Sequence, residues 1–513
     1  MTQRPGGETG VAAPGPGLES LDRWDAAFAA FHARFAPYFR RREVRERSAR
    51  YVRGLLGPVE RKNGWQLAEA IGERDPVGVQ RLLFAAAWDA QAVQQEQARF
   101  VAEHWGTPDG IFVVDESGFV KKGTKSAGVQ RQYSGTAGKV ENCQIGVFVA
   151  YVADFGQGGH AFLDRRLYLP REWAADPARR QEAGVPDDVA FQTKPDLAWA
   201  LLQRAWALGV PGRWVVGDTV YGQDPTLRAR LEREAPPGVH YVLAVPATTP
   251  VWTEVTDAVR QTEPAAPFAT RAYTVLQEQN AAARVARWGP DRWQRLTVAA
   301  GAKGPRTYDW AAARVQVEPS GARAATRWLL ARRSVSAPTE VAYYLCNAPP
   351  ETPLRTLAQV AAARWPIEQA LEEAKGETGL DHYEVRRWGS WHRHVTLALL
   401  AHTFLADLRR QAAPANRPPL APPRPPAPVA GGKGGRRRRP RRAGASAPAG
   451  ARADPPRRAD PLDRARGAAP TRGGPAPSTA LRGRAPGLVD LAPPTPGPRP
   501  SGPLPPPPRR FAS

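Results

Sequence analysis

Two aspartates follow short β-rich runs and could bind a metal ion together. Asp115 ends the run IFVVD and Asp218 ends the run WVVGD, and a small or polar turn is predicted after each. On its own, an aspartate at such a position is most often a structural cap of the turn. As a pair at the ends of neighbouring strands, however, the two carboxylates could share a divalent cation, and Mg²⁺ is preferred for phosphate chemistry. The pattern therefore suggests metal-dependent phosphoryl transfer.

A third carboxylate is available in the segment RWPIEQALEEAKGETGLDHYEVRRW, residues 364–388. A helix is predicted to begin near Arg364, because the proline two residues later suits a first helical turn. One face of this helix would carry Arg364, Glu368, Glu372 and Lys375, beside an apolar stripe of Ile367, Ala370, Leu371 and Ala374. Spacing alone favours surface ion pairs on this face and does not choose among Glu368, Glu372 and Glu373.

Other segments supply the elements that would position these carboxylates. Residues 20–106 show aromatic residues at helical spacing and predict a helical domain that packs on itself. From residue 110 onward, β-rich runs at 110–119, 143–155, 160–170, 213–222 and 240–247 and a helical pattern at 194–209 predict an α/β fold with a mixed sheet. An apolar helix is expected at 396–410.

The interval of about 245–350 is rich in tryptophan and arginine, and strands are predicted at 327–335 and 340–348. Trp288, Trp293 and Trp310 could stack on an unpaired DNA base. The alternative, that each fills the core of this segment, is the stronger expectation for any one of them.

The charge of the chain is unevenly distributed. The formal net charge is +23, and residues 413–513 hold 20 Lys+Arg against 4 Asp+Glu, or +16. The remainder, 52 basic against 45 acidic residues, carries +7. A basic chain favours an anionic partner, most often nucleic acid. The segment 413–513 is rich in Pro, Arg, Ala and Gly and is predicted to be disordered.

The two cysteines, Cys143 and Cys346, form no CxxC pair, which favours a reducing compartment. The N-terminal segment 1–19 is rich in Gly and Pro, is predicted to be disordered and lacks the apolar core of a signal peptide. The most apolar run of the chain, 396–408, is too short to span a membrane. These features predict a cytoplasmic protein.

Three segments resemble the DDE transposases of bacterial insertion sequences, in the insertion-sequence 701 family, which is related to the insertion-sequence 4 group. They are VVDESGFVKKGTKSAGVQRQYSGTAGKVENCQIGVFVAYV, WVVGDTVYG and RWPIEQALEEAKGETGLDHYEVRRWGSWHRHVTLALLAH. The segment GLLGPVERKNGWQLAE also fits, and the resemblance covers roughly residues 22–408. It implies a DNA transposase that cleaves the ends of an insertion sequence and joins them to target DNA.

The resemblance also implies an architecture. A helical DNA-binding domain would span 20–106 and an RNase H-like catalytic domain 107–412, with a β-rich insertion at about 245–350. The fold class is thus α/β, an RNase H-like core preceded by an all-helical domain and followed by the basic tail. Double-stranded DNA with terminal inverted repeats and target DNA would be the partners, and a homodimer is expected in the synaptic complex.

The resemblance assigns catalysis and metal binding to Asp115, Asp218 and Glu368, with Glu116 as the alternative to Asp115. It leaves Glu372 and Glu373 as a solvated flank of the helix. Two Mg²⁺ ions are implied, with Mn²⁺ as a substitute. The related group carries a signature of Tyr, Arg, Glu and Lys at fixed spacing. Arg364, Glu368 and Lys375 match that signature, but its tyrosine position is Ala361 here.

Further candidates for phosphate contact accompany this signature. Arg364 and Lys375 are expected to bind DNA phosphates, as are Lys121, Lys122, Lys125 and Arg131 in the Gly-rich stretch after the first aspartate. His382, His392, His394 and His402 suggest zinc only weakly, because no cysteine at ligand spacing accompanies them.

Alternatives stay open at this point. A nuclease with the same fold and no strand transfer, or an inactive or domesticated DNA-binding copy, would share these residues. The tail 413–513 could be a DNA-binding arm or the out-of-frame translation of a GC-rich gene, since helical periodicity stops abruptly after LADLRRQAA.

Overall fold

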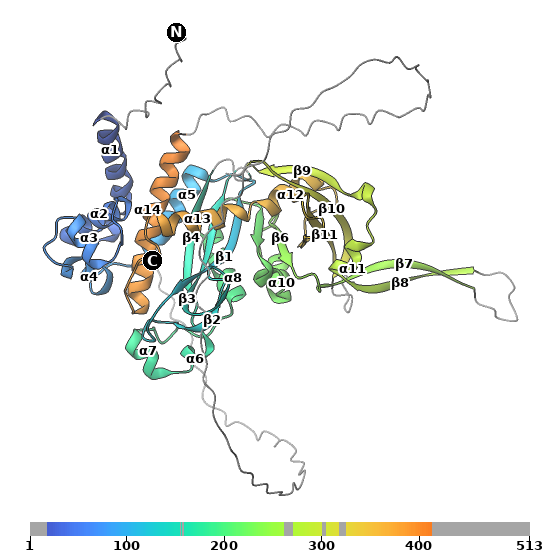
Figure 1. The fold of residues 1–513 in the computed structure, drawn as a ribbon, viewed down its shortest axis with the longest axis horizontal. Coiled ribbons are helices and arrows are strands. Elements are labelled where there is room, and N and C mark those ends of the chain that lie inside the picture. The colour runs from blue at the N-terminus through green and yellow to red at the C-terminus, as the bar shows by residue number, and fades with distance from the viewer. Residues whose placement is uncertain are drawn as a thin grey trace, which may run out of the picture. The chain divides into compact units, whose positions relative to one another are not determined.

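The computed structural model describes residues 18–153, 155, 159–260, 270–299, 304–317 and 325–412. These residues form one mixed sheet with helices around it (Figure 1). The expectation of an α/β fold with a mixed sheet is thus confirmed. The tail 413–513 and residues 1–17 of the N-terminal segment, both predicted to be disordered, lie outside the described residues.

The strands at the centre of the sheet were predicted from the sequence, except for β2 (Gln130–Ser134). β1 (Ile111–Val120) pairs antiparallel with β3 (Lys139–Val152), which also pairs antiparallel with β2 (Gln130–Ser134) and β4 (His160–Leu167). On its other edge β1 pairs in parallel with β5 (Trp214–Gly217), and β5 pairs in parallel with β6 (His240–Val245). The antiparallel and the parallel strands at the centre of the sheet therefore meet at β1, which has an antiparallel partner on one edge and a parallel partner on the other.

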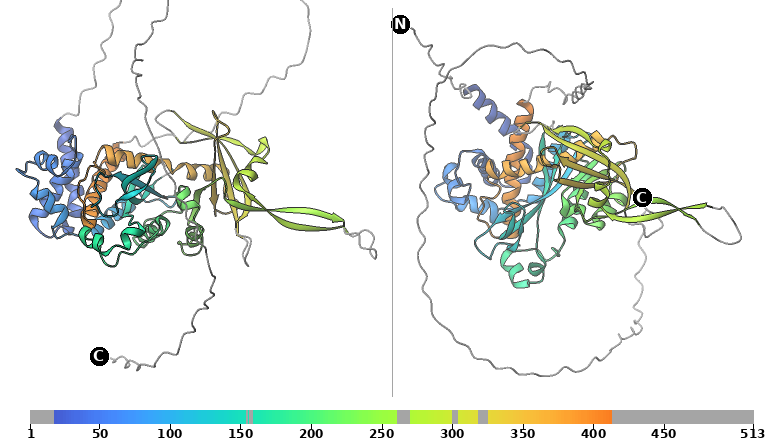
Figure 2. Two further views of the ribbon diagram at one scale, coloured as in Figure 1. Left: turned by 60° about the horizontal axis from the view of Figure 1, so that its bottom comes forward. Right: turned by 45° about the vertical axis from the view of Figure 1, so that its right-hand side comes forward.

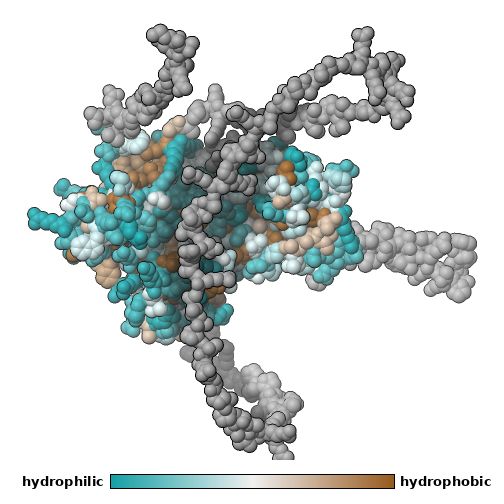
Figure 3. Space-filling view, in the orientation of Figure 1, coloured by the Kyte–Doolittle hydropathy of each residue, from teal (hydrophilic) through white to brown (hydrophobic). Residues whose placement is uncertain are grey.

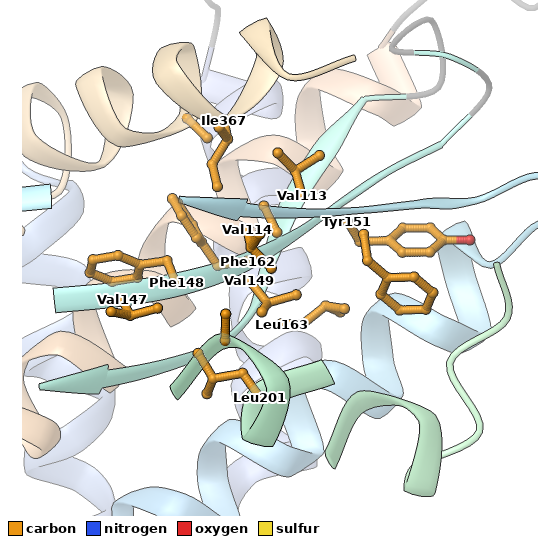
Figure 4. Close-up of a cluster of buried hydrophobic side chains, with 14 of the residues drawn as sticks. Val113, Val114, Val147, Phe148, Val149, Tyr151, Phe162, Leu163, Leu201 and Ile367 are labelled. Carbon is orange, nitrogen blue, oxygen red and sulfur yellow. The ribbon is translucent and has the colours of Figure 1, made fainter. Parts of the chain in front are cut away.

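The central strands are apolar on both faces because helices cover both faces. α8 (Lys194–Ala207) packs against β3 and β4, and α13 (Trp365–Gly376) packs against β1 and β4. Figure 4 shows Leu201 of α8 and Ile367 of α13 on opposite sides of the strands that carry Val113 and Val149. All four side chains are fully buried. Burying a side chain of this size contributes about 1.5–3 kcal/mol each.

The N-terminal helices pack around the last helix of the described chain. They are α1 (Leu18–Phe35), α2 (Arg42–Leu56), α3 (Gly64–Ala70), α4 (Val77–Phe84) and α5 (Ala90–Trp105), and α14 (Trp388–Ala412) contacts α2, α4 and α5. The Phe28 ring lies 5.4 Å from the Phe404 ring of α14, and Gln97 donates to the carbonyl of Phe162 in β4. The segment predicted to be a helical domain that packs on itself thus also packs on α14, which completes its aromatic stripe.

Six more strands follow β6 and extend the same sheet. They are β7 (Pro250–Arg260), β8 (Thr270–Asn280), β9 (Gln294–Ala299), β10 (Arg306–Val317), β11 (Ala325–Ser334) and β12 (Val341–Cys346). β12 pairs with β6 and so joins these strands to the centre of the sheet. β7 and β8 form a long two-stranded ribbon that projects away from the other strands (Figure 2).

The tryptophans of this segment lie mostly inside it. Trp310 is fully buried, Trp288 is 9% exposed and Trp293 is half-buried, 6.1 Å from Trp288 between ring centroids. Trp310 is thus a core residue, as the stronger expectation held, and its ring is not accessible to a DNA base.

Short helices complete the described chain. These are α6 (Arg171–Ala174), α7 (Pro177–Ala183), α9 (Thr219–Gly222), α10 (Pro225–Arg233), α11 (Ala281–Ala286) and α12 (Leu354–Ala362). Both cysteines are buried and unpaired. None of the helices in the described ranges combines the length and apolarity that crossing a bilayer requires.

On the face seen in Figure 3, the described residues are mainly hydrophilic, with hydrophobic residues in separate patches. The most exposed large apolar side chains include three on the N-terminal helices, Trp24 at 54%, Trp65 at 65% and Phe84 at 54%.

Candidate active site

Asp115 lies in the middle of β1, and its position in the sheet explains why it can still reach a site. The strand continues to Val120, so the prediction that Asp115 ends the strand before a turn was wrong. The reason is the antiparallel partner β3, which pairs with β1 along its whole length, Asp115 opposite Phe148. The parallel partner β5 is shorter, and its last pair joins Val114 to Gly217. Asp115 is therefore the first residue of β1 beyond the end of β5.

Asp218 is the first residue beyond the same pair on the other strand. It follows Gly217 directly and is the N-cap of α9, where its Oδ1 accepts a hydrogen bond from the Val220 backbone amide at 2.9 Å. The parallel register thus places Asp115 and Asp218 side by side at the end of the β1–β5 pairing. This neighbourhood was expected from the sequence; the register is what produces it.

Arg364 links Asp115 to Glu368. Its guanidinium lies 3.5 Å from the Asp115 carboxylate (Nη1 to Oδ2) and donates to Glu368 at 2.5 Å (Nη2 to Oε1). Arg364 is the N-cap of α13 and Glu368 lies in its first turn, as predicted. The apolar stripe Ile367, Ala370, Leu371 and Ala374 is buried and holds the helix on the sheet. One arginine therefore brings a carboxylate of the sheet and a carboxylate of α13 to the same place.

The electrostatics of the cluster are those of crowded carboxylates. Burial, together with the negative charge of Asp218, raises the pKa of Asp115 to about 7, although the Arg364 guanidinium acts in the opposite direction. Burial and the nearby Glu116 also raise the pKa of Asp218. The Asp115 side chain is 11% exposed and that of Glu368 is 48% exposed, so the cluster runs from the sheet to the surface. Removing a carboxylate from water disfavours its charged form, and a second carboxylate nearby adds to the effect.

Glu116 occupies the opposite face of β1. Successive strand residues point to opposite faces, and Glu116 accepts hydrogen bonds from Lys194 of α8 at 2.5 Å and from the Tyr221 hydroxyl at 3.1 Å. Asp115 instead faces Arg364 at the start of α13. The two neighbouring acids thus have different partners, and only Asp115 shares a cation with Glu368.

Two comparisons with known proteins indicate the family of this chain. The family model described as DDE superfamily endonuclease matches residues 34–305. The chain belongs to the DDE superfamily endonuclease family. The matched residues include Asp115 and Asp218, whereas Glu368 lies beyond their end.

A curated relative is named a probable transposase for insertion sequence element IS701, from Microchaete diplosiphon. It is 27% identical over 170 residues, which cover 33% of this chain. The match spans 41% of the length of that relative.

The lysines predicted after Asp115 have different surroundings in this DDE endonuclease. Lys121 is half-buried, donates to the Tyr383 carbonyl at 3.1 Å and lies 3.5 Å from the centre of the Tyr383 ring, and burial lowers its pKa to about 8. Lys125 forms an ion pair with Glu182 at 2.8 Å. Lys122 and Arg131 are exposed. Lys122 and Arg131 are thus the two of the four whose side chains are most open to a phosphate.

Lys375 spans from α13 to the far end of β1. Its Nζ lies 3.3 Å from the Thr136 hydroxyl and 3.4 Å from the Gly118 carbonyl, and burial lowers its pKa. The Lys375 ammonium group therefore lies near the C-terminal end of β1, beyond Asp115, and beside the turn that joins β2 to β3. Ala361, at the tyrosine position of the signature, is buried in α12.

The two other glutamates of α13 differ. Glu372 is exposed, as expected of a solvated flank. Glu373 was also expected to lie on the solvated flank, and this expectation was wrong. It is 17% exposed and accepts hydrogen bonds from Gln369 at 2.7 Å and from Arg409 of α14 at 2.9 Å. The reason is that α14 and β4 pack against this side of α13, which a single helical periodicity cannot show.

A cluster that the sequence did not predict lies beside the N-terminus of α13. The Trp365 ring stacks on Tyr308 of β10 with centroids 5.5 Å apart. Arg306 and Arg332 lie over the Trp365 ring at 4.5 and 5.1 Å. Within the described residues neither arginine has an ion pair with a carboxylate. The strands β10 and β11 thus place two cationic side chains next to the helix that carries Glu368.

Proposed function

We propose that this DDE endonuclease is a DNA transposase that cuts the ends of an insertion sequence and joins them to target DNA. The observation that carries the proposal is the adjacency of Asp115 and Asp218 at the end of the β1–β5 pairing, with Glu368 linked to Asp115 through Arg364. The likeness to a probable insertion-sequence transposase supports it. The catalytic domain would be RNase H-like, a fold that the antiparallel strands β4, β3 and β1 followed by the parallel strands β5 and β6 support.

The donor set of this site fits a divalent metal ion. Burial disfavours the ionised forms of Asp115 and Asp218, and a neighbouring carboxylate adds to the effect in each case, Asp218 for Asp115 and Glu116 for Asp218. A hard cation with oxygen ligands would relieve both effects. Asp115, Asp218 and Glu368 would hold the ions, in keeping with two Mg²⁺. Bound ions would act as Lewis acids for the attacking water or 3′-hydroxyl and for the scissile phosphate.

The residues of the chain would position the DNA around this centre. Arg364 would move away from the carboxylates and contact a non-bridging phosphate oxygen of the DNA. Lys375, Lys122 and Arg131 would bind phosphates farther along the DNA strand. Arg306 and Arg332 would bind the DNA on the side of β10 and β11. Positioning and charge stabilisation supply most of the rate in phosphoryl transfer. The helices of residues 20–106 would bind the element's ends, and two copies would meet in the synaptic complex.

A cleavage and joining assay tests the proposal. The substrate is a DNA fragment that carries both ends of the element as they flank the gene, with a supercoiled plasmid as target and Mg²⁺ in the buffer. We expect cuts at the ends and joined products, both lost in Asp218→Asn. Cuts without joining would identify a nuclease that performs no strand transfer. DNA binding without any cut would indicate an inactive copy.

A further inference from the structure

A second cluster of metal-ligating side chains lies away from the carboxylates of the candidate active site. His160 begins β4, Glu373 lies in the last turns of α13 and His402 lies in α14. The ligand atoms of the three side chains are all within 4.8 Å of one another. They come from three elements that are far apart in the sequence, so no local spacing could have indicated the cluster.

The distances suit one ion in particular. Nε2 of His160 and Nε2 of His402 each lie 3.4 Å from Oε2 of Glu373. Zinc binds imidazole nitrogen and carboxylate oxygen at about 2.0–2.2 Å, so two ligands of a tetrahedral zinc ion are about 3.3–3.5 Å apart. Two neutral imidazoles and one carboxylate form a common ligand set of zinc sites that keep a fourth position for water.

His402 provides a second, independent observation. Its side chain is fully buried, and neither Nδ1 nor Nε2 has a hydrogen-bond partner. Burying a polar atom without a hydrogen-bond partner destabilises the folded state. Nε2 is directed toward Glu373 and His160. A metal ion among the three side chains would satisfy this nitrogen, whereas the hydrogen bonds within the described protein do not.

The surroundings are compatible with a bound cation. Burial lowers the pKa of His402, which keeps the imidazole in the neutral form that binds metals. Burial acts against ionisation of Glu373, but the polar groups around its carboxylate hold its pKa well below the usual range. Arg409 also donates to Oε2 of Glu373, but it is bound to both oxygens of Glu377 at 2.5 and 2.6 Å. Metal-binding carboxylates commonly keep such an outer hydrogen bond.

We propose that His160, Glu373 and His402 form a zinc site that is separate from the catalytic carboxylates. The ion would join β4, α13 and α14 at one point. Because α13 also carries Glu368 in its first turn, the site would fix the helix that presents the third carboxylate. The proposal concerns metal binding alone and holds whether or not the protein transposes DNA.

Cobalt is a suitable probe because Co²⁺ replaces Zn²⁺ at such sites and gives visible absorption bands in a tetrahedral field. The full-length protein is stripped with a chelator and titrated with Co²⁺, then with Zn²⁺. We expect one equivalent of Co²⁺ to give the bands and one equivalent of Zn²⁺ to remove them. Absence of the bands in the wild-type protein would overturn the proposal.

Variants locate the ion. His160→Gln and Glu373→Gln change partly exposed side chains, and each should weaken binding by at least tenfold. His104→Gln is the matched control, an exposed histidine on α5. Asp115→Asn/Asp218→Asn separates the two sites and should keep the bands. Bands that persist in both cluster variants, or vanish in the double aspartate variant, would overturn the proposal. Circular dichroism spectra establish that each variant is folded; if one misfolds, the other decides.

Discussion

Asp115 and Asp218 are each the first residue after one pair of the parallel ladder, Val114 with Gly217. The lengths of the two strands differ greatly, ten residues in β1 and four in β5. The adjacency of the aspartates is therefore set by the register of the ladder and by the end of β5, not by the end of β1. The position of the two aspartates in the candidate site depends on this register.

The close packing of α9 against β6 should make Gly222 essential to the site. A Cβ on Gly222 would lie 1.8 Å from the Ala244 carbonyl oxygen, whereas a Cβ on Gly123 would meet no atom within 4 Å. We expect Gly222→Ala to lower the free energy of unfolding by on the order of 2 kcal/mol and Gly123→Ala to leave it nearly unchanged. Urea denaturation of the two variants measures the difference, and equal midpoints would contradict the packing described.

Replacement of Asp115 by a neutral side chain should stabilise the metal-free protein above neutral pH. The pKa of Asp115 is raised to about 7 in the folded protein, so the folded state binds the proton more tightly than the unfolded chain. Wild-type stability should therefore fall as pH rises from about 4 to about 7. The advantage of Asp115→Asn should be small at pH 4 and grow to on the order of 2 kcal/mol at pH 8.

Thermal unfolding in chelator at both pH values checks this expectation. Adding Mg²⁺ at pH 8 should raise the melting temperature of the wild type and have less effect on Asp115→Asn. A pH-independent difference between the two proteins would contradict the raised pKa of Asp115.

Arg364 should set the pH at which the site becomes active. Its positive charge lowers the pKa of Asp115, so removing the charge should raise that pKa further. In Arg364→Gln the acidic limb of the cleavage rate should shift to higher pH, and the rate at neutral pH should fall by at least tenfold. The rate profile of Arg364→Lys should stay closer to the wild type. An unshifted limb in Arg364→Gln would show that Arg364 does not act on the titrating carboxylate.

Arg332, which forms no ion pair with a carboxylate among the described residues, should contribute to DNA affinity. Loss of one phosphate contact lowers the slope of log K against log salt by about one. We expect that change in Arg332→Gln. Arg295→Gln is the matched control, because Arg295 is exposed in β9, which pairs with β10, but forms an ion pair with Asp309 at 2.9 Å. Salt titrations by fluorescence anisotropy compare the two, and equal slopes would argue against a role for Arg332.

The sequence predicts those parts of the molecule that depend on local patterns. Alternation and apolar runs located the central strands, and the proline at the start of α13 located its first turn. Contacts between distant segments were not predictable in this way. Glu373 is drawn into the interior by β4 and α14, and the N-terminal aromatic stripe is completed by Phe404.

At the candidate site, too, local patterns identified residues but not the contacts between distant segments. Asp115 and Asp218 are recognisable because each follows an apolar run, but the extension of β1 past Asp115 depends on β3, a partner that the run itself does not reveal. Glu368 was singled out among three glutamates by resemblance, and its link to Asp115 passes through Arg364. Arg306 and Arg332 reach the site because β10 and β11 lie beside α13, which no spacing in the sequence indicates.

The central claim is that Glu368 completes a catalytic set with Asp115 and Asp218. The most direct test compares Glu368→Gln with Glu372→Gln, an exposed glutamate four residues along the same helix, in single-turnover cleavage of the element's ends. We predict that Glu368→Gln cleaves at least 1,000-fold more slowly, on the order of 4 kcal/mol, while both variants bind the ends like the wild type. Cleavage by Glu368→Gln at a rate close to that of Glu372→Gln would contradict the assignment.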